Sequence, residues 1–173
     1  MKILGIDPGI GTTGFAVLDS ASHDRLVLVA SGEIRVADTA RKTGTQRGRL
    51  QFIYTEIGEI IDLHQPTVVA LEDTFFAKNV KSALTLGQAK GVAMLAAQMR
   101  NLAIFEYSPK SVKIAVVGFG GATKDQVKIM VSRILNLSVP IASEHTADAA
   151  AAAICHAHTS QWQGKLAVQT GQP

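Results

Sequence analysis

Three strand-like segments joined by short turns open this chain, and every later strand-like segment follows a helical one. The first covers residues 3–6 and the second residues 15–18, while the third runs over residues 26–36 with a break at Gly32, where we expect a β-bulge or kink. Strands joined by short turns pair antiparallel, whereas strands joined through a helix pair in parallel. The order of the segments therefore predicts an α/β fold, with a mixed five-stranded sheet covered by helices on both faces.

The remaining elements are predicted from apolar periodicity and from capping signals. Thr123 and Gln126 have the spacing of a capping box for a helix that begins at residue 124. Pro66 ends the predicted helix over residues 47–64. Residues 159–173 are polar, and we expect them to form a flexible tail. We expect helices over residues 47–64, 80–99, 109–117, 124–137 and 144–158, and strands over residues 68–71 and 102–107.

Composition limits the class of protein. The 173 residues are 47% apolar and 18% charged, which suits one domain with a substantial core, and we expect it to occupy residues 1–158. The single cysteine, Cys155, excludes a disulfide scaffold and an all-cysteine metal site. No apolar run approaches the roughly 18 residues that cross a bilayer, so we expect no membrane partner. Strand-like sequence from Lys2 onward leaves no room for a signal peptide, which favours a cytoplasmic protein.

Charge alternates along the chain in blocks. The net charge is +4 over residues 39–50, −5 over residues 51–75 and +7 over residues 76–133. Such alternation suits a protein that holds a polyanion and keeps carboxylates for a separate role. Ordinary solvated faces would produce the same blocks, so charge alone leaves both interpretations open.

A glycine-rich loop near the N-terminus imitates a nucleotide-binding motif. Gly9, Gly11 and Gly14 have the spacing of the dinucleotide fingerprint. That fingerprint requires a helix whose N-terminus receives the pyrophosphate, but residues 15–18 have the pattern of a strand. The sequence therefore disfavours a dinucleotide site here.

Acidic residues end two of the predicted strands. Asp7 ends the first and Glu72 the fourth, so both carboxylates would meet at one sheet edge if these strands are parallel neighbours. His145 and Asp148 are three residues apart in the first turn of the last helix and share a face. Converging carboxylates repel one another unless cations neutralise them, and hard oxygen ligands select Mg²⁺ or Mn²⁺. Two such ions about 4 Å apart can clamp a phosphodiester for hydrolysis.

Each of these acids also has an ordinary explanation. An aspartate before Pro8 and Gly9 is a common turn former, Glu72 could pair with a lysine, and Asp148 could complement the helix dipole. We assign no chemistry to His156 or His158, which lie two or more turns further along the helix.

Four stretches resemble the RuvC family of Holliday-junction resolvases, a branch of the ribonuclease H-like fold. They are ILGIDPGIGTTG at 3–14, ALEDTFFAKNVKSALTLGQAKGVA at 70–93, IFEYSPKSVKIAVVGFGGATKDQV at 104–127 and EHTADAAAAAICHAH at 144–158. The resemblance covers nearly the whole chain to His158, and the second stretch is long and specific.

The resemblance implies a hydrolase of DNA recombination and repair. It implies a structure-selective, metal-dependent endodeoxyribonuclease that resolves four-way DNA junctions by paired symmetric nicks, with 5′-phosphate and 3′-hydroxyl products and a preference for thymine-containing sites. It also implies cooperation with the RuvA–RuvB branch-migration machinery. Two equivalent scissile phosphates call for a C2 homodimer, and the helix with Gly87 and Gly91 is our candidate for its interface, close packing on the sheet being the alternative.

The resemblance also implies site residues. Asp7, Glu72, Asp148 and the position of His145 would be catalytic and would hold two Mg²⁺ or Mn²⁺ ions. Well-studied relatives have a carboxylate where this chain has His145; an imidazole lowers the negative charge, favours Mn²⁺ somewhat and can shuttle a proton. The expected DNA contacts are Phe75 as a wedge against a base, the lysines Lys78, Lys81, Lys113 and Lys124, and more loosely Arg41, Arg47 and Arg49.

Two other classes of protein remain as alternatives. A phosphotransferase of the actin-like ATPase group also opens with an aspartate and a glycine loop, but it needs a second related domain, for which 173 residues leave no room. A catalytically dead junction-binding module would tolerate the loss of an acid, yet Asp7, Glu72 and Asp148 are all present.

Overall fold

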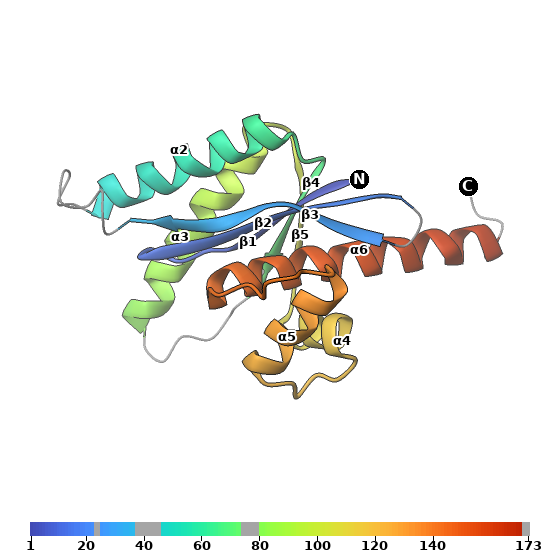
Figure 1. Cartoon of the computed structure of the whole chain (residues 1–173). Helices are drawn as coiled ribbons and strands as arrows, with labels where there is room; N and C mark the ends of the chain where they lie inside the picture. The colour runs from blue at the N-terminus through green and yellow to red at the C-terminus, as the bar shows by residue number, and fades with distance from the viewer. Residues whose placement is uncertain (23–24, 37–45, 74–79, 171–173) are drawn as a thin grey trace.

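The computed structural model describes residues 1–22, 25–36, 46–73 and 80–170 (Figure 1). Its centre is a five-stranded sheet with the strand order β3-β2-β1-β4-β5. The first three strands pair antiparallel, and β1–β4 and β4–β5 pair in parallel, as the order of segments predicted. The strands are β1 (Lys2–Asp7), β2 (Thr12–Ser22), β3 (Arg25–Arg35), β4 (Val68–Glu72) and β5 (Ala103–Tyr107).

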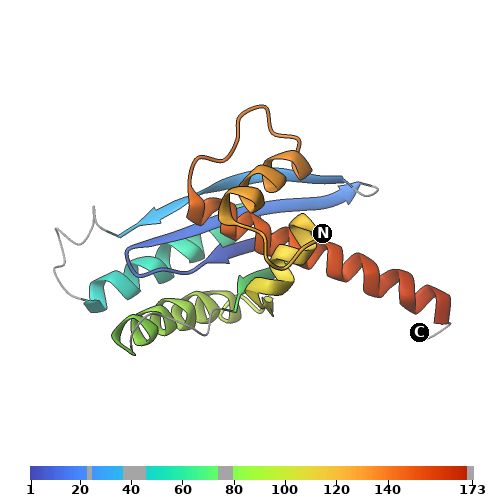
Figure 2. The same ribbon diagram turned by 90° about the horizontal axis from the view of Figure 1, so that it is seen from below.

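Helices cover both faces of the sheet, so the predicted α/β architecture is confirmed. One layer contains α2 and α3, which pack against each other, and the other contains α6 with α4 and α5 beside it (Figures 1 and 2). No helix in the described part of the chain combines the length and the apolar character that crossing a bilayer demands. The helices are α2 (Gln46–His64), α3 (Val80–Gln98), α4 (Pro109–Val117), α5 (Lys124–Ile134) and α6 (Glu144–Thr170).

Two apolar cores, one on each face, hold the layers together. Successive residues of β1 point to opposite cores: Ile3 packs with α6, and Leu4 packs with α2 and α3. Such a strand is apolar at nearly every position because both of its faces are buried. The core beneath α6 is built largely from that helix's alanines, which are fully buried over residues 149–153.

Alanine on α6 and glycine on the sheet bring the two backbones unusually close together. A Cβ atom on Gly5 would lie 2.0 Å from the carbonyl oxygen of Ala149, and one on Gly14 would lie 2.1 Å from that of His145. Only glycine permits this approach. The third glycine of the fingerprint-like loop thus serves helix–strand packing, and it precedes a strand residue, Phe15, as predicted.

Three local predictions are wrong. No bulge occurs at Gly32, which pairs in register with Phe15 and leaves room for its ring; the register shifts instead between Val17 and Leu18. The helix α5 ends at Ile134 rather than at residue 137. The last helix continues past His158 to Thr170, because no glycine or proline interrupts its next turn. The flexibility of residues 159–173 stays a prediction.

Candidate active site

Two carboxylates meet at one end of the central strand pair. The parallel register of β1 and β4 pairs Ile6 with Leu71, so the next residues, Asp7 and Glu72, leave the sheet side by side. Burial of the preceding apolar residues on both faces fixes this register, because a slip of one residue would turn the core side chains outward. The carboxylates therefore emerge where the sequence predicted.

The first turn of α6 adds two further groups. His145 Nδ1 donates a hydrogen bond of 2.7 Å to Asp7 Oδ2, with the imidazole half exposed and the aspartate largely covered. Asp148 follows one turn later on the same face. The close approach of the helix to Gly14 is what brings this turn to the end of β1.

All four predicted ligands line one pocket of about 440 Å³. The predicted DNA-contacting lysines Lys113 and Lys124 share its wall. The remaining lining residues are Pro8, Gly9, Leu86, Pro109, Val112 and Val127. Residues from six parts of the chain thus form a single concave surface that combines three carboxylates and an imidazole with two lysines.

The carboxylates are destabilised in their charged form. Burial raises the pKa of Glu72 to about 7, and repulsion from Asp148 and Asp7 adds to this shift. Burial also raises the pKa of Asp7, although the hydrogen bond from His145 opposes the shift. Shifts of this kind mark groups whose charge lacks compensation, and they cluster at functional sites.

Lys124 supplies part of the missing positive charge. Its ammonium group lies 3.4 Å from Asp148 Oδ2 and 3.5 Å from Glu144 Oε2, and it is mostly exposed. The capping box of Thr123 and Gln126 fixes the start of α5 and hence the position of this lysine. The lysine can therefore contact either a carboxylate or an incoming phosphate.

The donor set suits a divalent cation by its chemistry. Three carboxylates that repel one another share this pocket with one imidazole, and together they offer the oxygen and nitrogen ligands of Mg²⁺ and Mn²⁺. Within the described residues, no three His, Cys, Asp or Glu side chains converge closely enough to be a ready-made metal site. Asp7 is engaged with His145 and Asp148 with Lys124.

The other predicted DNA contacts are only partly covered. Phe75, Lys78 and Arg41 lie outside the described residues. Lys81 is exposed in the first turn of α3 and lines a neighbouring pocket of about 450 Å³ together with Leu86, which also lines the acidic pocket. Arg49 is exposed on α2, whose first turn contains Arg47.

Residues to which we assigned no chemistry have structural partners. His156 is buried and shares a hydrogen bond of 2.7 Å with the Tyr107 hydroxyl, and His158 Nδ1 donates to the carbonyl of Ala115 at 3.0 Å. Cys155 is buried. Asp73 accepts a hydrogen bond of 2.7 Å from Lys90.

Sequence reasoning missed one group near the site. Glu33, on β3, accepts a hydrogen bond from Ser143, the residue that precedes α6. These residues are 110 positions apart, and nothing in either segment signals their contact.

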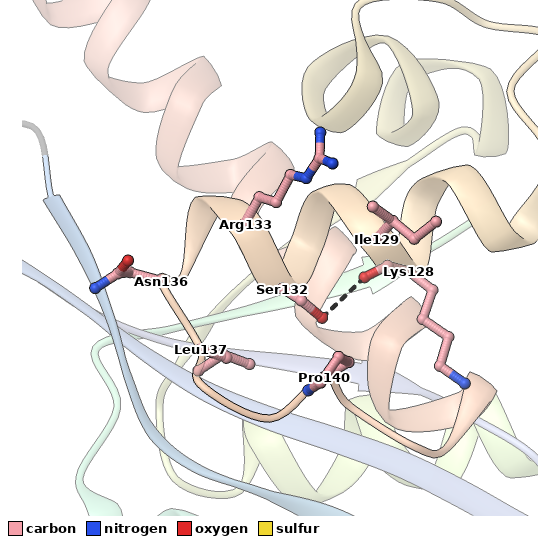
Figure 3. A pocket seen from close by; sticks show the side chains of 7 residues that line it. All are labelled: Lys128, Ile129, Ser132, Arg133, Asn136, Leu137 and Pro140. Carbon is pink, nitrogen blue, oxygen red and sulfur yellow. Dashed lines mark hydrogen bonds between the residues drawn. The ribbon is translucent and has the colours of Figure 1, made fainter.

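A second pocket, of about 430 Å³, lies beside α5 (Figure 3). Ser132 donates to the carbonyl of Lys128 at 3.0 Å, and the Lys128 and Arg133 side chains point in different directions. Among the described residues, no acid, histidine or cysteine lines this pocket, so it lacks the usual ligands of a metal ion.

Comparisons with known proteins agree on one group of relatives. A family model described as "Crossover junction endodeoxyribonuclease RuvC" matches residues 3–156. The crossover junction endodeoxyribonuclease RuvC of Pelotomaculum thermopropionicum is 46% identical over 166 residues, which are 96% of this chain and 98% of that protein. The same enzyme of Caldicellulosiruptor saccharolyticus is 42% identical over 156 residues, 90% of this chain and 92% of that protein.

Solved structures show the same likeness. Thermus thermophilus RuvC in complex with a Holliday junction substrate has a TM-score of 0.86 at 29% identity, covering 94% of this chain and 96% of that one. The yeast mitochondrial Holliday junction resolvase Ydc2 has a TM-score of 0.62 at 14% identity and covers 94% of this chain and 83% of its own, a likeness of fold alone.

Proposed function

The chain belongs to the RuvC family of crossover junction endodeoxyribonucleases, and we propose that it resolves four-way DNA junctions by two symmetric nicks, with Asp7, Glu72, His145 and Asp148 as its metal-binding and catalytic residues. We assign this activity to residues 1–158 as one nuclease domain, in the cytoplasm and in the service of recombination and repair. The family match over residues 3–156 supports these bounds.

One observation carries the proposal. Asp7 and Glu72, from neighbouring parallel strands, and His145 and Asp148, from the first turn of α6, line a single pocket. Burial, together with repulsion from Asp148 and Asp7, raises the pKa of Glu72 to about 7, and a cation in the pocket would stabilise its charged form. The site is thus built to bind positive charge.

Nucleases of this family depend on divalent metal ions, and the donor set here suits two Mg²⁺ or Mn²⁺ ions. When bound, such ions lower the pKa of water and stabilise charge on the attacking and leaving oxygens of the phosphodiester. Asp7 and Glu72 would hold them from the sheet, and Asp148 and His145 from the helix. The imidazole of His145 in place of a fourth carboxylate reduces the negative charge of the pocket, which eases the approach of the phosphate.

The cationic side of the pocket would hold the DNA backbone. Lys113 and Lys124 face the same space as the acids, so a phosphate bound between them would lie beside the metal ligands. Their charge can also offset the charge that develops in the transition state. Lys81 extends the cationic surface along the first turn of α3, and we assign Phe75 and Lys78 to the same DNA interface.

A stripe along α3 supports a homodimer. Val80, Leu84, Leu95 and Met99 are all more than half exposed at helical spacing, and a Cβ atom on Gly87 or Gly91 would meet no described atom within 4 Å. The glycines therefore do not pack on the sheet; the buried face of this helix is formed by Ala89, Ala93, Ala96 and Ala97. Two copies joined through this stripe would present two sites with the symmetry of the junction. RuvA–RuvB is the partner that we assign to the resolving complex.

Cleavage of a synthetic four-way junction tests the activity. We expect the chain to nick opposing strands in Mg²⁺ or Mn²⁺, and Asp7→Asn to bind the junction but to nick it at least 100-fold more slowly, because one metal ligand is lost. Asp19→Asn, on β2, is the matched control and should nick normally. Normal nicking by Asp7→Asn would refute the metal assignment.

Sedimentation tests the dimer. We expect Leu84→Glu to shift the chain toward monomer, since it places a charge in the apolar stripe. Leu63→Glu alters an equally exposed leucine on α2 and should leave the association unchanged. If the two variants sediment alike, the apolar stripe of α3 does not form the dimer interface.

A further inference from the structure

The N-terminus of α6 is fastened to the edge strand β3 by two contacts outside the acidic pocket. The Ser143 hydroxyl donates to Glu33 Oε1, and the Thr146 hydroxyl donates to the carbonyl of Gly32 at 3.1 Å. Glu33 and Gly32 are consecutive on β3, so both hydrogen bonds are made to the same short segment of the strand. On α6 and just before it, the residues that make these contacts, Ser143 and Thr146, lie on either side of His145 in the sequence.

Both contacts lie where water competes poorly. Thr146 is 4% exposed at the interface between the helix and the sheet, and the Glu33 side chain is 13% exposed. A buried hydroxyl–carbonyl bond is costly to lose, because water cannot readily replace the missing donor. Ser143 also accepts from the Thr146 amide at 3.2 Å, so the two contacts share one capping structure.

The geometry gives this anchor a defined role. The helix approaches β2 so closely at Gly14 that its first turn has no room to move toward the sheet. The β3 contacts prevent it from moving away. His145 and Asp148 lie on this same turn, so the anchor sets their distance from Asp7 and Glu72 on the sheet.

We propose that Glu33 and Thr146 are positioning residues, which hold the first turn of α6 at the distance from the sheet that the metal-binding site requires. This inference rests on the proposed function and deepens it. Neither residue lines the pocket, and we expect each to act by fixing the first turn of the helix. Groups that orient metal ligands in this way contribute about 10–100-fold to metal affinity when they are measured by mutation.

Titration of the DNA-free chain with Mn²⁺ alone tests the proposal. We expect Thr146→Val, which keeps the shape but loses the hydroxyl, and Glu33→Ala to bind Mn²⁺ at least 10-fold more weakly than the unaltered chain. Thr146→Ser keeps the donor and should restore binding. Ser132→Ala removes another buried hydroxyl, which donates within α5, and should bind Mn²⁺ normally. Arg35→Gln removes the exposed partner of Glu33 and should also leave Mn²⁺ binding unchanged.

Junction cleavage supplies a second readout. We expect kcat to fall in Thr146→Val and Glu33→Ala with KM nearly unchanged, because the DNA contacts lie on other elements. If the two residues served stability alone, the variants would have a lower melting temperature but unchanged Mn²⁺ affinity and kcat when folded, and that result would overturn the proposal. Equal Mn²⁺ binding by Thr146→Val and Thr146→Ser would also overturn it. Failure of the unaltered chain to nick would instead refute the proposed function, and the Mn²⁺ titrations would still decide the role of the anchor.

Discussion

His145 Nδ1 and Asp7 Oδ2 lie 2.7 Å apart although 138 residues separate them in sequence. The bond joins the first turn of α6 to the end of β1. The helix backbone also approaches the sheet closely at Gly5 on β1 and at Gly14 on the neighbouring strand β2. The bond from His145 occupies a carboxylate oxygen that we assign to a metal ion. The same two residues, His145 and Asp7, are proposed metal ligands, so a bound metal ion would share the Asp7 carboxylate with this hydrogen bond.

The imidazole of His145 predicts a metal preference that a carboxylate at this position would change. In His145→Asp a fourth carboxylate replaces the softer imidazole, so we expect the ratio of the nicking rate in Mn²⁺ to that in Mg²⁺ to fall by about 3–10-fold. Junction cleavage in each metal measures the ratio. His158→Asp, further along α6, is the control for an added acid. An unchanged ratio would argue that His145 does not contact the metal.

The raised pKa of Glu72 predicts how the stability of the metal-free chain depends on pH. The carboxyl ordinarily ionises near 4.5 and does so at about 7 in the folded chain, so between these values the folded state holds a proton that the unfolded state has released. The free energy of unfolding contributed by this group therefore falls as the pH rises from 4.5 to 7. The raised pKa of Asp7 acts in the same direction.

Denaturant unfolding in chelator measures this effect. We expect Glu72→Gln to exceed the unaltered chain in stability at pH 8 by about 1–2 kcal/mol, after allowance for the partial exposure of the group, and to match it near pH 4.5. Glu59→Gln, an exposed change on α2, should show no such difference. Added Mn²⁺ should reverse the order at pH 8, since only the unaltered site binds it fully. A parallel pH profile for Glu72→Gln and the unaltered chain would count against charge repulsion in the pocket.

Lys124 should contribute to both DNA binding and catalysis. For Lys124→Gln we expect the slope of log affinity for a junction against log salt to fall in magnitude by about one, because one phosphate contact is lost. We also expect kcat to fall by about 10–100-fold through lost stabilisation of the transition state. Arg25→Gln removes an exposed cation on β3 and should change neither quantity. An unchanged kcat would show that Lys124 pairs with Asp148 but does not stabilise the transition state.

Lys90 should be a stability residue. Its largely buried ammonium group pairs with Asp73 and with Glu106, and it thereby joins α3 to the ends of β4 and β5. Lys90→Met strands two carboxylates, so we expect a loss of about 2–3 kcal/mol in the free energy of unfolding measured with urea. Lys81→Met, exposed on the same helix, should cost under about 0.5 kcal/mol. Addition of Asp73→Asn and Glu106→Gln to Lys90→Met should recover much of the loss; no recovery would point to packing instead.

Much of this fold could be predicted because its signals are local. Short turns between the first strands, the capping box at Thr123 and the acids that end β1 and β4 each follow from a few adjacent residues. The convergence of Asp7 and Glu72 needed one further assumption, that their strands are parallel neighbours, and helix crossovers make that pairing the ordinary one.

The rest depends on contacts between distant segments. A glycine within a strand, such as Gly32, is typical of a β-bulge, but here its missing side chain leaves room for the Phe15 ring on the paired strand. The anchor of Glu33 on Ser143 and the hydrogen bond of His145 to Asp7 appear only when α6 is placed on the sheet. Local propensity carries no information about such pairs.

The backbone contacts of α6 at Gly5 and Gly14 have a consequence for laboratory evolution of this chain. The sheet has no side chain at these two points, so the spacing there cannot be adjusted by exchanging larger and smaller residues, and saturation mutagenesis should find almost no tolerated substitution at either glycine. Selection for altered cleavage must then change the loops and α5, while the helix-to-sheet spacing stays constant throughout the library.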